Sequence, residues 1–209
     1  MAETTTRSRN PRGEGGRLRA EIVAAAVELL DETSDQSTIT LRSVARRVGI
    51  AAPSIYRHFP DQPAIMLAVV QQAFGELEAQ LGAALTGDDP RERLLAICHA
   101  YLRFAEDHPS RYRTMFGGVW MPALDDSTSI TEQDVSTLGD NCIRLLTEAL
   151  TDCVNAGVAT STDPHADTVA LWLGMHGLAH QKAVTVSFPW PPDIAERVIT
   201  TLTHLTDGV

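Results

Sequence analysis

The sequence has little of what secreted, membrane-spanning or metal-binding proteins need. Its 209 residues include three cysteines, at positions 98, 142 and 153, and no two of them form a Cys-x-x-Cys pair. This spacing argues against a disulfide framework and for reduced thiols. No apolar run reaches the roughly 18 residues that span a bilayer, and residues 1–16 lack the apolar centre of a secretory signal. We therefore expect a cytoplasmic protein with no membrane partner.

Positive charge is scarce and unevenly distributed. Residues 1–60 hold nine arginines against seven acidic residues, a balance of +2, whereas residues 61–209 hold eight basic against twenty acidic residues, a balance of −12. The two balances sum to the net charge of −10. A basic end on an acidic body can meet a polyanion in only one orientation, because the body is repelled. We expect residues 1–16 to form a disordered basic arm.

The 3.6-residue apolar period of amphipathic helices recurs along most of the chain, and we find no strand pattern and no internal repeat. The predicted fold is all-α, with a small three-helix head at residues 17–62 and a larger helical domain at residues 63–209. Helices are expected at residues 17–32, 41–48, about 54–59, 62–85, 91–107, 110–116, 131–156, 164–187 and 193–205.

The stretch from Thr40 to Phe59, "TLRSVARRVGIAAPSIYRHF", predicts a helix-turn-helix. Thr40 is a good N-cap for the first helix, and Gly49 supplies a left-handed stop. The second helix needs apolar residues to lock it onto its neighbours and short polar or cationic residues to enter the DNA major groove. The inward set is Ile50, Ile55 and Phe59; the outward set is Ala52, Pro53, Ser54, Arg57 and His58, with Tyr56 at the boundary.

The longer run "ITLRSVARRVGIAAPSIYRHFPDQPAIM" closely resembles the N-terminal DNA-binding segment of the TetR (tetracycline-repressor-like) family of transcriptional regulators. A second stretch, "WLGMHGL" from Trp172, resembles the Trp-His-Gly signature of some members' C-terminal domain. The resemblance implies a DNA-binding regulator in which phosphate contacts set the register and Ser54 and Arg57 lie nearest the base edges. The implied DNA-contacting residues are Thr40, Arg42, Ser43, Ala52, Pro53, Ser54, Tyr56, Arg57, His58 and Gln62.

Two positions depart from the family pattern. Ala51 stands where the family usually has a serine that caps the recognition helix, a loss that costs on the order of 1 kcal/mol. Pro53 can offset this cost by preorganising the first turn. Gln62 stands where the family usually has a lysine that contacts a phosphate. We expect weaker affinity from that contact, or compensation from the arginine-rich arm.

The C-terminal half is expected to supply the dimer interface and the effector site. Helices 164–187 and 193–205 carry apolar stripes that would form a four-helix bundle with a second copy, as the resemblance implies; the alternative is that both stripes fill a monomer core. A two-fold dimer predicts a palindromic operator. Aromatic, sulfur-containing and histidine side chains suit a pocket for a small organic effector. The candidates are Phe104, Tyr112, Met115, Phe116, Trp120, Met121, Cys142, Leu146, Trp172, His176 and His180.

The predicted mechanism is repression that an effector relieves, by moving helix 62–85 and changing the separation of the two DNA-reading heads. Two alternatives remain open. One is a metal-binding or hydrolytic enzyme that uses the face shared by His176 and His180, although Gly177 stands where a zinc protease needs its glutamate. The other is a constitutive DNA-binding protein without an effector. We expect no cofactor and no metal ion, and a gating role for Gly117, Gly118 and the loop at residues 120–129.

Overall fold

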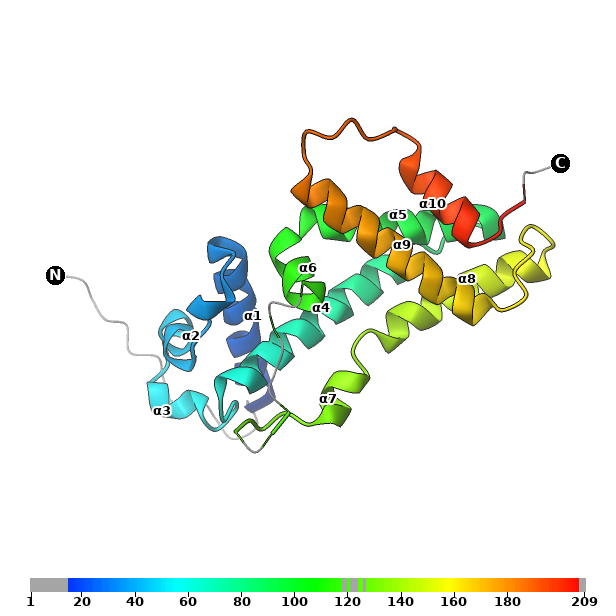
Figure 1. Ribbon diagram of the computed structural model, residues 1–209. Coiled ribbons are helices and arrows are strands. Elements are labelled where there is room, and N and C mark those ends of the chain that lie inside the picture. Colours follow the sequence, from blue (N-terminus) through cyan, green and yellow to red (C-terminus); the bar gives the residue numbers. More distant parts are fainter. Residues whose placement is uncertain (1–14, 118–119, 121–123, 126, 207–209) are drawn as a thin grey trace. The chain divides into compact units, whose positions relative to one another are not determined.

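The structure is a computed structural model that describes residues 15–117, 120, 124–125, 127–206. Helices account for most of these residues (Figure 1), and the one extended pairing among them is an isolated antiparallel bridge between Ala159 and Leu205. The predicted all-α fold is confirmed. None of the described helices is both long enough and apolar enough to cross a membrane. The predicted basic arm lies almost entirely outside the described residues.

Contacts divide the chain into two compact units. The head unit contains the residues up to Ala73 together with Ser110–Leu138, and the body unit contains Phe74–Pro109 together with the residues from Gly139 onward. The segment at residues 110–138, which the sequence assigned to the larger domain, therefore has its contacts with the head.

The head unit is built on helices α1 (Gly15–Thr33), α2 (Leu41–Val48) and α3 (Ala52–Ile55), with the short 3-10 helix η1 (Gln36–Thr38) between the first two. It also contains the first half of α4 (Gln62–Ala84), as well as α6 (Pro109–Phe116) and α7 (Glu132–Ser136). One apolar cluster joins α1, α2, α3 and the first half of α4, because the amphipathic helices turn their apolar sides inward, and Trp120 packs against it. Its buried members include Ile22, Ala26, Leu30, Val44, Ile55, Phe59 and Ile65.

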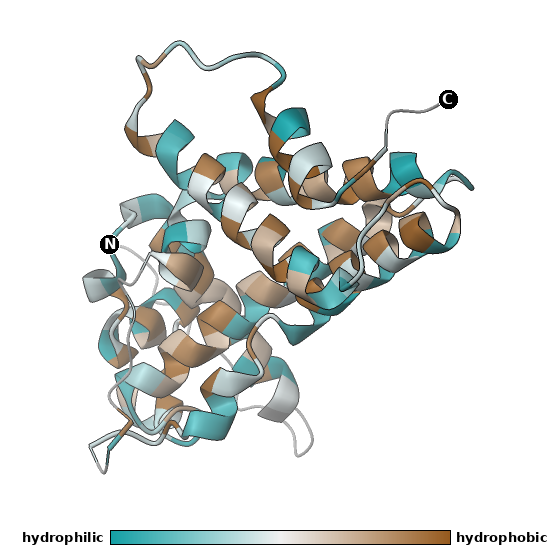
Figure 2. Ribbon diagram, turned by 45° about the vertical axis from the view of Figure 1, so that its right-hand side comes forward, coloured by the Kyte–Doolittle hydropathy of each residue, from teal (hydrophilic) through white to brown (hydrophobic). Residues whose placement is uncertain are grey.

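The body unit contains the second half of α4, then α5 (Pro90–Asp107), α8 (Asp140–Asn155), α9 (Pro164–Val184) and α10 (Ile194–Leu202). Helix α8 packs against α5 and α9, and α10 packs along α9. Hydrophobic and hydrophilic residues are interspersed along the helices (Figure 2). The body core includes Leu94, Ile97, Cys98, Leu150, Leu171 and Met175.

The predicted single helix at residues 131–156 is wrong, because the structure breaks it into α7 and α8. Gly139 adopts a left-handed conformation with φ of 86° at the start of α8. A Cβ atom at this position would lie 2.9 Å from Cε1 of Phe74. The break therefore needs a glycine both for its backbone conformation and for the close approach of the Phe74 ring.

The predicted end of the helix that begins at residue 164 is also wrong, since α9 stops at Val184 rather than at residue 187. The Thr185 hydroxyl donates to the carbonyl oxygen of Gln181 at 2.6 Å and so satisfies one of the last carbonyl groups of the helix. Residues 185–193 then form the connection to α10, the arch that follows α9 in Figure 1.

Candidate nucleic-acid interface

Helix α2 starts at a capping box, as the sequence predicts for Thr40. The Thr40 hydroxyl accepts from the Ser43 amide at 3.1 Å, and the Ser43 hydroxyl oxygen accepts from the Thr40 amide at 2.9 Å. The Ser43 hydroxyl itself donates to the carbonyl oxygen of Thr38 at 2.6 Å. Both side chains therefore have a structural role in the cap, and their predicted contacts with DNA stay predictions.

Gly49 ends α2 in the left-handed conformation that the sequence predicts, with φ of 74° and ψ of 32°. Its amide donates to the carbonyl oxygens of Ala45 and Arg46, and the amide of Ile50 donates to Ala45 at 3.0 Å. This turn satisfies the carbonyl groups at the end of α2 and redirects the chain into α3.

Helix α3 has its apolar side in the head core, as predicted. Ile55 and Phe59 are fully buried, and Ile50 packs against the same cluster. The regular helix ends at Ile55, earlier than predicted, and the chain continues as a hydrogen-bonded turn in which the amides of His58 and Phe59 both donate to the carbonyl oxygen of Ile55. Ala51 makes no side-chain cap, which confirms the lost hydrogen bond that the sequence indicated.

The other side of α3 faces away from the core. Pro53, Tyr56 and Arg57 are exposed, and the Tyr56 side chain has 51% of its surface accessible. Ser54 and His58 are half-buried, as is Ala52. The segment therefore combines a buried apolar side with an accessible polar side, which is the arrangement that a helix needs to enter the major groove.

The arginines of α2 have different environments. Arg47 forms an ion pair with Glu32 at 2.5 Å and with Glu28 at 3.4 Å, both on α1. The hydrogen bond from Arg47 lowers the pKa of Glu32, and the reciprocal bond raises the pKa of Arg47. Arg42 and Arg46 are exposed. Arg47 thus ties α2 to α1, whereas Arg42 is accessible for a phosphate contact.

The N-terminus of α4 lies beside an acidic residue that sequence reasoning did not single out. Asp61 accepts from the Ala64 amide at 2.8 Å and from the Ser129 amide at 2.8 Å, so it caps α4 and holds the segment before α7. Gln62, at the first position of α4, is exposed. The signal for this cap was present in "PDQP", because aspartate just before a helix is a preferred N-cap.

Arg19 is a second residue that the sequence left without a role. Its guanidinium carbon lies 4.7 Å from the centroid of the Phe59 ring, within the range of a cation–π interaction. The contact joins α1 to the turn after α3. Spacing alone could not reveal it, because the two residues are 40 positions apart in the sequence.

The predicted effector residues are divided between the two units. Tyr112 is buried in the head unit, Met115 and Phe116 are half-buried there, and Trp120 packs against the head core. In the body unit, Phe104, Cys142 and Leu146 are buried, Trp172 and His176 are half-buried, and His180 is exposed. Met121 lies outside the described residues, as do Gly118 and part of the predicted gating loop. The role of this set in effector binding stays a prediction.

His176 and His180 share one side of α9, and His176 lies near Trp172, with 6.1 Å between the ring centroids. Burial, followed by the nearby His180, lowers the pKa of His176 below its ordinary value of 6.5. Across the part of the chain that the structure describes, no group of three or more His, Cys, Asp or Glu side chains is placed to hold a metal ion.

Two family models match the chain. The model of the N-terminal domain, "Bacterial regulatory proteins, tetR family", matches residues 22–69, and the model "Tetracyclin repressor-like, C-terminal domain" matches residues 94–205. The second match alone covers more than half of the 209 residues. The chain belongs to the TetR family. It is therefore a DNA-binding regulator rather than an enzyme, and the helix-turn-helix described above is the TetR-family DNA-binding element.

Curated TetR-family relatives match mainly over part of their length. The nucleoid occlusion factor SlmA of Vibrio campbellii is 29% identical over 104 residues, which is 49% of this chain and 53% of SlmA. The transcriptional activator FasR of Mycolicibacterium smegmatis is 29% identical over 148 residues, which is 70% of this chain and 60% of FasR. The chain thus spans about half to three fifths of the length of these relatives.

Solved structures have the same fold over nearly the whole chain. A protein of unknown function from Rhodococcus is 25% identical with a TM-score of 0.72, and the match covers 93% of this chain and 95% of that one. The fatty acid degradation regulator FadR of Bacillus halodurans is 13% identical with a TM-score of 0.67, over 94% of this chain and 97% of that one. The second likeness, at this identity, concerns the fold alone.

Proposed function

We propose that this protein is a repressor that binds a palindromic operator as a homodimer and leaves it when a small organic effector binds. The observation that carries the proposal is the accessible side of α3 and of the turn after it, where Tyr56 and Arg57 are exposed while Ile55 and Phe59 hold the segment in the head core. Two such helices related by a two-fold axis would read two half-sites about one DNA turn, ~34 Å, apart.

The proposed homodimer uses α9 and α10, and the exposed side of α9 supports it. Leu173 and Val184 have 55% and 60% of their surface accessible, and Gly177 and His180 lie between them on the same side at helical spacing. Exposed large apolar side chains two to three turns apart on one side of a helix suit a protein–protein interface. A Cβ atom at Gly177 would meet no atom within 4 Å, so a second helix could approach closely there.

Gly174 has a different role within the same helix. A Cβ atom at this position would lie 2.5 Å from Cδ1 of Leu202 and 3.1 Å from Cγ1 of Val198, both on α10. Gly174 therefore faces α10 within the same protomer, and its missing side chain lets α10 pack closely on α9. We assign the exposed stripe at Leu173, Gly177, His180 and Val184 to the dimer.

The effector would bind among the aromatic and sulfur-containing side chains predicted above. The members in α5, α8 and α9, all in the body unit, support an apolar ligand with a few polar groups. A coupling of about 1–3 kcal/mol between effector and operator is enough for a 5- to 150-fold change in DNA affinity. FasR, which matches 70% of this chain, is by its name an activator, so the direction of regulation is part of the proposal.

The test is to select a binding site from random DNA with the full chain and to measure stoichiometry and affinity on it at fixed salt. We expect a palindromic site occupied by two chains, and at least a fivefold loss of affinity with an effector found by a thermal-shift screen. In vitro transcription from a promoter overlapping this site should fall when the protein is added. A DNA site occupied by one chain would refute the dimer. If no ligand from the thermal-shift screen changes the DNA affinity, the constitutive DNA-binding protein is favoured. Activated transcription would refute the repressor.

A further inference from the structure

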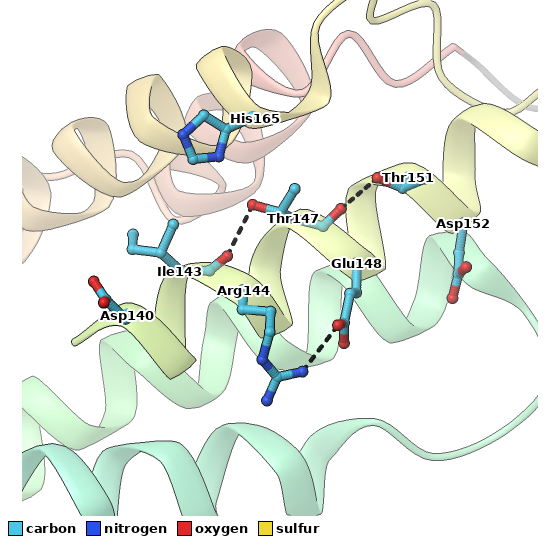
Figure 3. A pocket seen from close by; sticks show the side chains of 8 residues that line it. All are labelled: Asp140, Ile143, Arg144, Thr147, Glu148, Thr151, Asp152 and His165. Atoms are coloured by element: carbon cyan, nitrogen blue, oxygen red, sulfur yellow. Dashed lines mark hydrogen bonds and ion pairs between the residues drawn. The ribbon is translucent and has the colours of Figure 1, made fainter. Parts of the chain in front are cut away.

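The body unit has an open groove between α8 and the first turn of α9. Its volume is about 490 Å³, and Figure 3 shows its lining side chains. Ile143, Thr147 and Thr151 come from successive turns of α8, and His165 faces them from α9. The acidic and basic members, which are Asp140, Arg144, Glu148 and Asp152, complete the lining.

The polar groups of this groove are largely satisfied within the protein. The Thr147 hydroxyl donates to the carbonyl oxygen of Ile143 at 2.9 Å, and the Thr151 hydroxyl donates to that of Thr147 at 2.7 Å. Because both hydroxyls bond to the helix backbone, the groove gains apolar character from their methyl groups and from Ile143. Arg144 pairs with Glu148 at 2.9 Å, and Arg93 pairs with Asp152 at 3.2 Å. These pairs compensate two of the three carboxylates that line the groove, Asp140 being the third, so the part around Ile143, Thr147 and Thr151 suits an uncharged apolar occupant.

The connection between α9 and α10 has the complementary properties. Its residues 185–192, "TVSFPWPP", carry no charged side chain and include three prolines. Val186 has 83% of its surface accessible and Phe188 has 54%, and the Phe188 ring lies against Trp190 with 4.6 Å between centroids. Exposed apolar side chains on a proline-rich segment lose little entropy when a partner covers them.

Symmetry relates this connection to the groove. In an antiparallel crossing of two α9 helices with Gly177 on the two-fold axis, Val184, the last residue of α9, lies opposite residue 170 of the other copy. At a rise of 1.5 Å per residue, this point is about 10 Å from the crossing point. The connection leaves α9 there, beside the N-terminal half of the other copy's α9, whose first turn contains His165 at the border of the groove.

We propose that the occupant of the groove is the connection of a second copy of this chain, with the partner's Val186 and Phe188 seated over Ile143, Thr147 and Thr151. The arrangement is self-complementary, since each chain offers one apolar projection and one groove, as a two-fold interface requires. The proposal rests on the homodimer proposed above and adds a second contact on each side of the α9 crossing. Helix α8, which lies outside the predicted dimer interface, thereby becomes part of it.

A disulfide formed between two singly substituted proteins tests this arrangement. Full-length Phe188→Cys and Thr147→Cys proteins are mixed and diluted, so that their dimers dissociate and exchange subunits. The mixture is then concentrated and oxidised. The native cysteines, which are buried, should react little. We expect a covalent dimer in the mixture that exceeds the yield from either protein alone by at least fivefold, because a disulfide needs Cα atoms about 4.4–6.8 Å apart. The matched control replaces Thr147→Cys with Asn155→Cys, an exposed α8 position outside the groove.

A second measurement uses sedimentation on the uncrosslinked proteins. Phe188→Ser should raise the dimer dissociation constant at least tenfold, whereas Phe188→Leu should stay within threefold of the parent. A parent that sediments as a monomer would overturn the dimer and this inference together. If the unsubstituted protein is a dimer, equal crosslinking of Phe188→Cys to Thr147→Cys and to Asn155→Cys would overturn this inference and leave the dimer standing. A dimer dissociation constant unchanged by Phe188→Ser would also overturn this inference alone.

Discussion

The guanidinium group of Arg111 in α6 forms a two-pronged ion pair with the carboxylate of Asp31 near the end of α1, with Nε 3.1 Å and Nη2 2.5 Å from Oδ2. Beside it, the hydroxyl groups of Ser34 and Ser110 lie 2.8 Å apart. Ser34 has a positive φ of 54°, uncommon for a residue other than glycine. These contacts explain why α6 belongs to the head unit although it follows α5 directly in the chain.

Replacing Arg111 with alanine should therefore destabilise the head. Bidentate charge-assisted pairs are stronger than ordinary surface pairs, but Asp31 is 38% accessible, so solvent screening limits the effect to about 1 kcal/mol. For a chain of this size that loss corresponds to a fall of about 2–4 °C in Tm. Calorimetry on Arg111→Ala and on Arg113→Ala, an exposed arginine of the same helix, checks the prediction. Equal effects of the two substitutions would show that the Asp31 pair contributes nothing.

Two glycines with open space around them should respond to alanine in opposite directions. A Cβ atom would meet nothing within 4 Å at Gly49 or at Gly75, but Gly49 has φ of 74° whereas Gly75 lies inside α4. Gly49→Ala should lower the free energy of unfolding by about 1–2 kcal/mol, and Gly75→Ala should raise it by about 0.5–1 kcal/mol. Urea titrations of both variants measure the two changes. A stabilised Gly49→Ala protein would mean that the turn after α2 does not require the left-handed conformation.

Substitutions at the accessible residues of the turn after α3 should distinguish a residue that contributes DNA affinity from one that sets sequence preference. Tyr56→Phe removes a hydroxyl that is expected to reach a phosphate, so it should weaken binding to operator and to random DNA by similar factors. Arg57→Ala should change the preference among bases and cost about 1–3 kcal/mol on the selected site. Gel shifts at one salt concentration distinguish the two, because phosphate contacts make affinity steeply dependent on salt. A harmless Tyr56→Phe substitution would remove that residue from the interface.

The stability of the body unit should depend on pH through His176. Burial and the nearby His180 lower its pKa in the folded state below the unfolded value of 6.5. The unfolded chain then binds more protons, so the free energy of unfolding falls as the pH drops below about 6.5, and continues to fall until the pH passes the folded-state pKa. His176→Gln should flatten this slope between about pH 7 and pH 5. An unaltered slope in His176→Gln would refute the assignment.

The helices with strong amphipathic patterns and clear end signals were predicted well. Thr40 and Gly49 bound α2 as expected, and the buried positions of Ile55 and Phe59 follow from their spacing of four residues. These features are local, because a cap or a left-handed stop involves side chains and backbone within a few residues of one another. The family resemblance in the same segment is confirmed by the match to residues 22–69.

Other boundaries were decided by residues distant in sequence. The break at Gly139 depends on the ring of Phe74, and the close packing at Gly174 depends on Val198 and Leu202. Similarly, no local pattern in residues 110–138 indicates that Arg111 pairs with Asp31 of α1, that Ser110 bonds to Ser34 just after α1, or that Trp120 packs against the head core. No spacing rule within one segment predicts which distant side chain will occupy the space beside it.

The amino-acid sequence by itself determined that this chain is helical, that residues 40–59 form a helix-turn-helix, and that the chain resembles TetR-family regulators, because periodicity, caps and turns are encoded over a few neighbouring positions. Only the tertiary structure decided which polar groups are already used within the protein and which apolar groups remain uncovered. Arg47 is paired with α1 while Arg57 is exposed, and Gly174 is packed against α10 while Gly177 is open. These pairs of like residues differ only in their distant neighbours, and it is packing between helices that supplies those neighbours.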